Sequence, residues 1–135
     1  KGLFPFIILN LYSENIGLLQ TIFLCHFSIL GHIFPIWLKF KGGKGVATYI
    51  GFLFGINLTL GLFFLITWLA IALVFKYSSL SSIIATTIAP IYFFVKEDNY
   101  IAIFLIYLLA VIVIKHHENI KRLLNRTENK IKLSK

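Results

Sequence analysis

Long uncharged apolar runs, separated by short polar segments, are the feature that most limits what this chain can fold into. The three longest runs cover residues 17–38, 58–75 and 78–95, and shorter runs cover 3–12, 46–56 and 100–114. Only 13% of the residues are charged, whereas a soluble domain carries about 25%. Because so little polar surface cannot cover a core of this size, we expect much of the apolar surface to face a lipid bilayer.

The apolar runs predict helices rather than strands. Their apolar residues are continuous instead of alternating, and an open sheet edge cannot face lipid. A spanning helix needs about 20 residues, so the three longest runs come near spanning length, whereas 3–12 and 46–56 are short. We therefore predict an all-α fold, a polytopic transmembrane helix bundle of about six passes, with residues 1–135 forming a single integral membrane domain.

The basic residues indicate how such a bundle would be oriented. Six passes place twelve of the thirteen lysines and arginines on one side of the membrane and only Lys96 on the other. The positive-inside rule makes the first side cytoplasmic. That side holds Lys1, the 39–45 loop, the 76–77 turn and the tail, whereas the 13–16 loop, Asn57 and the 96–99 loop lie on the opposite side. The carboxyl terminus is therefore predicted to be cytoplasmic.

A glycine- and lysine-rich segment, residues 39–48, is the strongest candidate for a functional site. It contains Lys39, Lys41, Gly42, Gly43, Lys44 and Gly45. Glycines let backbone N–H groups approach an anion, and a helix predicted to begin after Gly45 would add its N-terminal N–H groups. The segment lacks the GxxxxGK[ST] spacing of a nucleotide-binding loop. The alternative is a basic cytoplasmic loop in which the glycines only make a turn.

The serine-rich segment, residues 76–82, begins the run 78–95 and holds four serines. Serine side chains at the start of a helix commonly cap its free backbone N–H groups. Capping explains one or two of the four, so the functional alternative is that some hydroxyls donate to a phosphate.

The basic tail, residues 115–131, also allows two interpretations. Helical spacing places His116 and Asn119 on one face, while Ile120, Leu123 and Leu124 form an apolar stripe. A basic amphipathic helix can simply lie on anionic lipid headgroups. The alternative is that His116 and Asn119 point into a site at the membrane boundary, where histidine can donate, accept or shuttle protons.

Several classes of chemistry lack the residues that they need. Cys25 is the only cysteine, so no internal disulfide and no cysteine-rich metal site are expected. The net charge of +8 follows membrane topology, so we expect no nucleic-acid partner. Asp98 is the only aspartate and is predicted on the outer side, which disfavours two-metal phosphoryl transfer and glycosidase chemistry. We predict no metal site and no cofactor.

Taken together, the three segments resemble the bacterial acyl-phosphate:glycerol-3-phosphate acyltransferases, the PlsY family. The resemblance rests on GHIFPIWLKFKGGKGVAT, on YSSL, and on HHENIKRL followed by Thr127 and Glu128. It covers essentially all 135 residues in the right order. It implies a seven-helix enzyme of the bacterial inner membrane that acts in phospholipid biosynthesis.

The resemblance also implies a reaction and its partners. A fatty acyl group passes from acyl phosphate to the first hydroxyl of sn-glycerol 3-phosphate, giving lysophosphatidic acid and inorganic phosphate. The partners are these two substrates and membrane lipids, and neither acyl-CoA nor acyl carrier protein is the direct donor. A non-catalytic membrane anchor or anion-permeation subunit is the alternative, and it needs a continuous polar path. The few polar candidates for such a path, chiefly Asn57, Thr59, Thr67 and Thr86, form no obvious stripe.

The family motifs assign roles to individual residues. Gly42, Gly43, Lys44 and Gly45 are implied to bind glycerol 3-phosphate, and Ser79 is implied to be a phosphate ligand. His116 and Asn119 are the implied catalytic pair. The glutamate that family members need for structural integrity falls on Glu128 or Glu118, which the sequence does not separate.

The chain departs from the family pattern at two kinds of position. His117 stands where many members have Arg, and Arg126 stands where many have Gly. The family's first helix and its first cytoplasmic motif, a Ser-Gly-Asn-rich stretch with an arginine, are expected before Lys1. We therefore expect the 135-residue chain to be N-terminally incomplete and to be inactive by itself.

Overall fold

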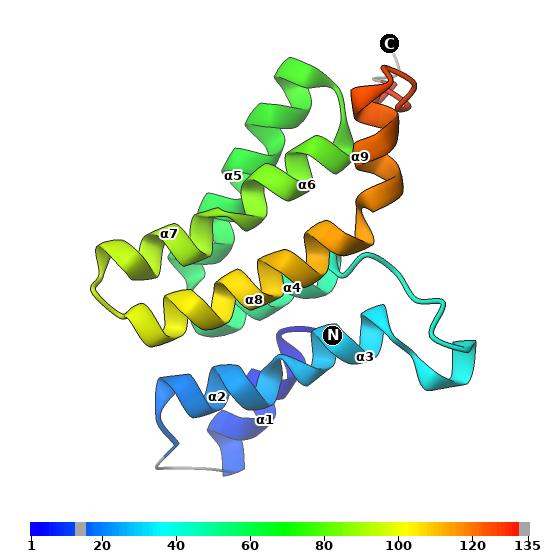
Figure 1. The fold of residues 1–135 in the computed structure, drawn as a ribbon. Coiled ribbons are helices and arrows are strands. Elements are labelled where there is room, and N and C mark those ends of the chain that lie inside the picture. Colours follow the sequence, from blue (N-terminus) through cyan, green and yellow to red (C-terminus); the bar gives the residue numbers. More distant parts are fainter. Residues whose placement is uncertain (13–15, 133–135) are drawn as a thin grey trace. The chain divides into compact units, whose positions relative to one another are not determined.

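The computed structural model describes residues 1–12 and 16–132, and over those residues the chain is helical, with connecting turns and no strand (Figure 1). This confirms the predicted all-α class. Residues 13–15 of the predicted 13–16 loop lie outside the described residues. The chain divides into two compact units, Lys1–Leu62 and Phe63–Lys135.

The first unit is built around a small apolar core. Its helices are α1 (Phe4–Tyr12), α2 (Leu18–Cys25), α3 (Phe27–Ile33), the 3₁₀ turn η1 (Ile36–Leu38) and α4 (Val46–Ile56). Helix α1 packs against α2 and α4, and α3 also packs against α4. Fully buried side chains of Ile22, Ile29, Phe52 and Leu53 fill the space between them. The core therefore holds the residues on either side of the glycine–lysine segment.

The second unit contains most of α5 and the remaining helices. These are α5 (Leu58–Phe75, whose first turn belongs to the first unit), α6 (Ser78–Thr86), α7 (Ile88–Val95), α8 (Asn99–Lys115) and α9 (His117–Leu124). Helices α7 and α8 lie side by side as an antiparallel pair (Figure 1). Helix α6 packs against α8 and α9, and Ala85, Leu105, Leu108 and Ile112 are fully buried.

The helix ends follow local signals in the sequence. The run 17–38 is interrupted at Pro35, after which only the short turn η1 follows. Asn57 separates α4 from α5, and its side-chain Oδ1 accepts a hydrogen bond of 2.7 Å from the Thr59 N–H. Asp98 does the same for α8, accepting from the Ile101 N–H at 3.3 Å.

Three helical segments among the described residues are long and apolar enough to cross a membrane: Leu18–Leu38, Leu58–Phe75 and Ser78–Val95. They coincide with the three longest apolar runs. Helices α8 and α9 would make a fourth if they are taken as one span bent by 63°. Helix α5 is apolar around its circumference, with exposed Leu, Ile and Phe side chains on several faces, as lipid contact requires. Six passes remain a prediction, because α1 and α4 are too short to span unaided.

Candidate active site

The glycine–lysine segment lies in the first unit, between η1 and α4. Gly45 is the residue before α4 and has a φ of 87°, a left-handed conformation that glycine adopts without a steric penalty. Helix α4 begins at Val46, as the sequence predicted. No side chain of the described residues caps this helix. Its first N–H groups are therefore available to an anion.

Glycine is needed at position 42 because of close packing, not because of an unusual φ. A Cβ atom there would lie 2.3 Å from the His32 carbonyl oxygen and 2.5 Å from that of Ile33. These are backbone atoms at the carboxyl end of α3, so they cannot move aside. At Gly43 a Cβ would instead lie 2.6 Å from Nε2 of the His32 side chain. The two glycines thus hold the loop against α3 and His32.

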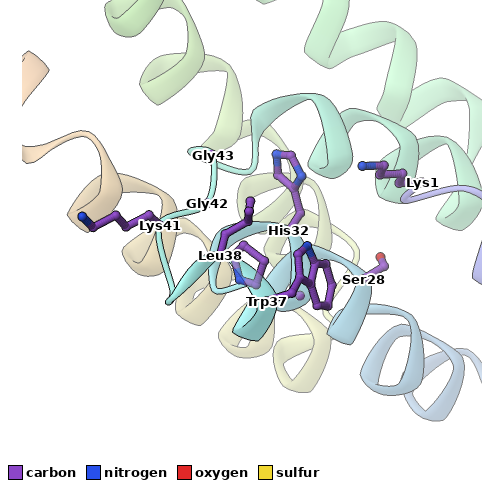
Figure 2. Close-up of a pocket in the computed structure, with 10 residues that line it drawn as sticks. Lys1, Ser28, His32, Trp37, Leu38, Lys41, Gly42 and Gly43 are labelled. Atoms are coloured by element: carbon purple, nitrogen blue, oxygen red, sulfur yellow. The ribbon is translucent and has the colours of Figure 1, made fainter.

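A cavity of about 500 Å³ opens beside this loop (Figure 2). Its lining combines basic and polar groups with apolar ones: Lys1, Ser28, Gly31, His32, Pro35, Trp37, Leu38, Lys41, Gly42 and Gly43. Figure 2 shows the His32 ring directed toward Gly43. Of the predicted site residues, Gly42 and Gly43 therefore line a cavity, whereas Lys44 is exposed and lies outside this lining. Lys41 belongs to the predicted segment 39–48 but was given no individual role, and His32 was not predicted as a site residue.

The serines of α6 do not cap their helix, so the capping interpretation is wrong for the described structure. Tyr77 occupies the N-cap position, and no side chain caps α6. Ser81 and Ser82 instead donate to backbone carbonyls four residues earlier, at 2.8 Å each. Ser82 also accepts a hydrogen bond of 3.0 Å from Trp68 Nε1, which links α5 to α6.

Ser79 and Asn119 meet at one carboxylate, that of Glu128. The Ser79 hydroxyl donates to Glu128 Oε1 at 2.6 Å, and the Asn119 side-chain amide donates to the same oxygen at 2.7 Å. Arg122 Nε donates to Oε2 at 2.7 Å and forms an ion pair with it. We call these four residues the Glu128 cluster. It joins α6, α9 and the segment that follows α9.

The Glu128 cluster keeps its carboxylate ionised. The Glu128 side chain is only 8% exposed. Burial alone would raise its pKa, but the hydrogen bonds from Ser79, Asn119 and Arg122, together with the charge of Arg122, outweigh burial and lower the pKa from 4.5 to about 2. At neutral pH the carboxylate therefore acts only as a hydrogen-bond acceptor.

Glu118, the other candidate for the family's structural glutamate, has a different environment. Its carboxylate is 57% exposed and pairs with the exposed side chains of His117 at 3.0 Å and Lys121 at 3.5 Å. Surface pairs of this kind contribute little to stability. The environment therefore separates the two glutamates, because only Glu128 joins elements that are distant in the sequence.

His116 lies at the junction of α8 and α9, and its side chain is buried. Its Nδ1 lies 2.8 Å from the Ile112 carbonyl oxygen. Since a carbonyl oxygen can only accept, Nδ1 carries a proton and donates to it. Asn119 is buried one turn further along α9. The two predicted catalytic side chains therefore share the second unit with Ser79 and Glu128.

Arg122 is the cluster member that sequence reasoning missed. The sequence spacing could have indicated it, because Arg122 follows Asn119 by three residues and therefore lies beside it on a helix. No sequence pattern indicated that the segment after α9 would place Glu128 in contact with both Asn119 and Arg122. Over residues 1–12 and 16–132, no group of three or more His, Cys, Asp or Glu side chains is placed to hold a metal ion.

The apolar helices and the basic and polar site residues at their ends define a multi-pass integral membrane protein. A family model described as glycerol-3-phosphate acyltransferase matches residues 1–126. The chain belongs to this family.

Curated relatives and a solved structure agree with that assignment. A glycerol-3-phosphate acyltransferase of Pelagibacter ubique (strain HTCC1062) is 55% identical over 106 residues, which are 78% of this chain and 55% of that protein. One of Francisella tularensis subsp. tularensis (strain FSC 198) is 46% identical over 133 residues, 97% of this chain and 63% of that protein.

The crystal structure of PlsY (YgiH), an integral membrane glycerol 3-phosphate acyltransferase in its glycerol 3-phosphate form, superposes with a TM-score of 0.79 at 35% identity. The match covers 95% of this chain and 64% of that one. A second crystal structure of PlsY, in its lysophosphatidic acid form, has the same TM-score and identity. The chain thus spans 55–63% of the length of the two curated relatives.

Proposed function

We propose that the full-length protein containing this chain is an acyl-phosphate-dependent glycerol-3-phosphate 1-O-acyltransferase of phospholipid biosynthesis. The observation that carries the proposal is the likeness of 95% of this chain to PlsY, whose crystal structures include a glycerol 3-phosphate form and a lysophosphatidic acid form. Those two molecules are the acceptor and the product of the proposed reaction. Fatty acyl phosphate, the donor, and membrane lipids are the further partners.

The glycine–lysine segment is the proposed binding site for the phosphate of glycerol 3-phosphate. The left-handed Gly45 and the close-packed Gly42 shape the loop, and the uncapped start of α4 offers backbone N–H groups to an anion. Lys44 is exposed beside them and adds a mobile positive charge. Together with Gly43, these residues neutralise and orient the phosphate group of the acceptor.

Ser79 is proposed to help bind the phosphate, and His116 and Asn119 are proposed to orient the reacting groups. The primary hydroxyl oxygen of glycerol 3-phosphate attacks the acyl carbonyl carbon, the new ester C–O bond forms, and the bond between the carbonyl carbon and the phosphate oxygen breaks. The hydroxyl proton leaves with the released phosphate or passes to water. Because phosphate is a good leaving group, positioning of the two reactants supplies much of the acceleration, up to about 7–11 kcal/mol. Glu128 holds the structure around Ser79 and Asn119.

The proposed location is the bacterial inner membrane, with the carboxyl terminus in the cytoplasm. The charge distribution supports this orientation, since twelve of the thirteen Lys and Arg residues fall on one side if the chain makes six passes. Residues 1–135 then belong to a single integral membrane domain, with the segments 39–48, 76–82 and 115–131 on its cytoplasmic face. This face is where water-soluble glycerol 3-phosphate is available.

An assay in liposomes separates acylation from anion permeation. The full-length protein containing this chain is reconstituted with radiolabelled glycerol 3-phosphate and palmitoyl phosphate. We expect label to appear in lysophosphatidic acid, and to do so only with palmitoyl phosphate present. Label that crosses the membrane without entering lipid would contradict the enzyme and support the permeation subunit. The same assay on residues 1–135 alone is expected to give no product.

A further inference from the structure

We propose that residues 34–41, which we call the interfacial turn, dock on the anionic phospholipid surface of the membrane. In this arrangement Trp37 and Phe40 lie at the boundary between the headgroups and the acyl chains, and Lys39 and Lys41 contact lipid phosphates. The partner is the bilayer surface and not a substrate of the proposed reaction. The inference therefore goes beyond the proposed function and is independent of it.

The interfacial turn leaves several large apolar side chains exposed. The exposed fraction is 75% for Ile36, 78% for Trp37 and 59% for Phe40, and Leu38 is also exposed. The 3₁₀ turn η1, which carries three of these side chains, ends the candidate span Leu18–Leu38. Tryptophan is enriched where a span meets the membrane–water interface. Contact with lipid therefore accounts for an exposure that would be unfavourable in water.

The backbone of the interfacial turn is suited to the edge of a bilayer. Backbone polar groups that approach lipid must find partners within the protein. The N–H groups of Leu38 and Phe40 both donate to the Pro35 carbonyl oxygen, at 3.1 and 3.0 Å. The Lys41 N–H donates to the Leu38 carbonyl oxygen at 3.0 Å. The turn can therefore approach the acyl chains without leaving these donors unpaired.

The charges of the interfacial turn favour an anionic lipid surface over other partners. Lys39 and Lys41 are exposed, and the described part of the first unit, residues 1–12 and 16–62, contains no Asp or Glu. An apolar protein segment would cover the aromatic side chains but would leave both lysine charges unpaired. A zwitterionic bilayer would accept the aromatic rings but has no net negative charge. Anionic phospholipid supplies both an apolar layer and negative headgroups.

The first experiment measures which lipid lies next to Trp37. The full-length protein containing this chain is reconstituted in liposomes of phosphatidylglycerol and phosphatidylcholine in equal amounts. One lipid or the other carries bromine, which quenches tryptophan fluorescence, and the signal of Trp37 is the difference between wild type and Trp37→Phe. We expect brominated phosphatidylglycerol to quench this signal about twofold or more above brominated phosphatidylcholine, as attraction of two lysines to anionic headgroups predicts.

Two results in the wild type would overturn the proposal. Equal quenching by the two lipids would show that the turn meets lipid without selecting an anionic headgroup. No quenching by either lipid would show that another part of the protein, or water, covers Trp37.

The double variant Lys39→Gln/Lys41→Gln isolates the charge and keeps the aromatic side chains in place. We expect the preference for phosphatidylglycerol at Trp37 to fall to near equality, because the attraction to the anionic surface is lost. Lys96→Gln is the matched control, since it removes a lysine on the opposite predicted side, and it should keep the wild-type preference. An unchanged preference in the double variant, or an equal loss in the control, would contradict the role of these two lysines.

A depth measurement completes the test. Bromine placed on the acyl chain near the headgroup should quench Trp37 more strongly than bromine placed near the end of the chain. The reverse order would place the turn inside the hydrocarbon core and would overturn the proposal. Acyl transfer is not needed for any of these measurements, so a protein without acyltransferase activity would contradict the proposed function and leave this test intact.

Discussion

The hydroxyl of Ser79 lies 2.6 Å from the carboxylate of Glu128, although 49 residues separate them in the sequence. This contact joins the start of α6 to the segment that follows α9. Asn119 and Arg122 complete the same junction. The relationship explains how one glutamate outside the helices can hold two of the predicted site residues at once.

The ionisation of Glu128 predicts how stability depends on pH. Its pKa is about 2 in the folded chain against an ordinary value of 4.5, so the folded state favours the charged form. The stabilisation is fully present above pH 4.5 and is lost as the pH falls toward 2. Melting temperatures of the detergent-solubilised wild type and Glu128→Gln, measured from pH 7 to pH 2.5, should differ most at neutral pH. A gap that persists unchanged at pH 2.5 would contradict this account.

Gly42 and Gly43 are predicted to differ in their tolerance of a side chain. At Gly42 a methyl group meets two backbone carbonyls, so Gly42→Ala should destabilise the fold by about 1–3 kcal/mol. At Gly43 the added methyl group meets the His32 ring, which can rotate. Gly43→Ala should therefore lower the free energy of unfolding by less than Gly42→Ala does. Thermal unfolding of both variants in detergent makes the comparison. Equal losses, or a larger loss at Gly43, would show that the loop packs differently.

Glycine at position 126 is predicted to make the folded chain more stable than the arginine found there. It has a φ of 58° and follows the cap of α9. The N–H groups of Arg126 and Thr127 donate back to Leu123 and Arg122, as in a Schellman motif. Removing the Cβ should relieve about 1–2 kcal/mol of left-handed strain, so Arg126→Gly should raise the melting temperature. Arg126→Gln keeps the strain and should not.

The Trp68–Ser82 hydrogen bond is predicted to couple α5 to α6. Its length is 3.0 Å, and Ser82 also donates to the Ser78 carbonyl. A double-mutant cycle of Trp68→Phe and Ser82→Ala should give a coupling of about 0.6 kcal/mol, typical of side-chain hydrogen bonds between membrane helices. Unfolding in mixed micelles provides the measurement. Additive losses would mean that the bond contributes nothing to packing.

The sequence predicted the helices well because their ends carry local signals. The predicted runs 46–56 and 58–75 coincide with α4 and α5, and the helix predicted after Gly45 begins at Val46. The breaks within two runs were not predicted. Pro90 lacks the N–H that would bond to the Thr86 carbonyl and crowds that carbonyl, which accounts for the end of α6 at Thr86. At His26, which separates α2 from α3, the side chains of His26 and Ser28 bond to the backbone carbonyls of Phe23 and Cys25 in α2.

The candidate site was predictable only where residues lie close in the sequence. His116 and Asn119 share a helical spacing, and the glycines share a loop. The Glu128 cluster depends on the turn at Arg126, where a non-glycine residue adopts a left-handed conformation that sequence patterns do not favour. The positions of Lys41 and His32 in the cavity lining depend likewise on how the loop folds against α3.

Acylation of glycerol 3-phosphate by a Lys44→Ala variant tests the central claim most directly. In the full-length protein containing this chain, reconstituted with palmitoyl phosphate, we expect kcat/KM for glycerol 3-phosphate to fall about tenfold to a hundredfold, as loss of a charged contact to phosphate predicts. Lys96→Ala, which removes a lysine from the opposite predicted side, should stay within twofold of wild type. An undiminished rate in Lys44→Ala would contradict phosphate capture by the glycine–lysine segment.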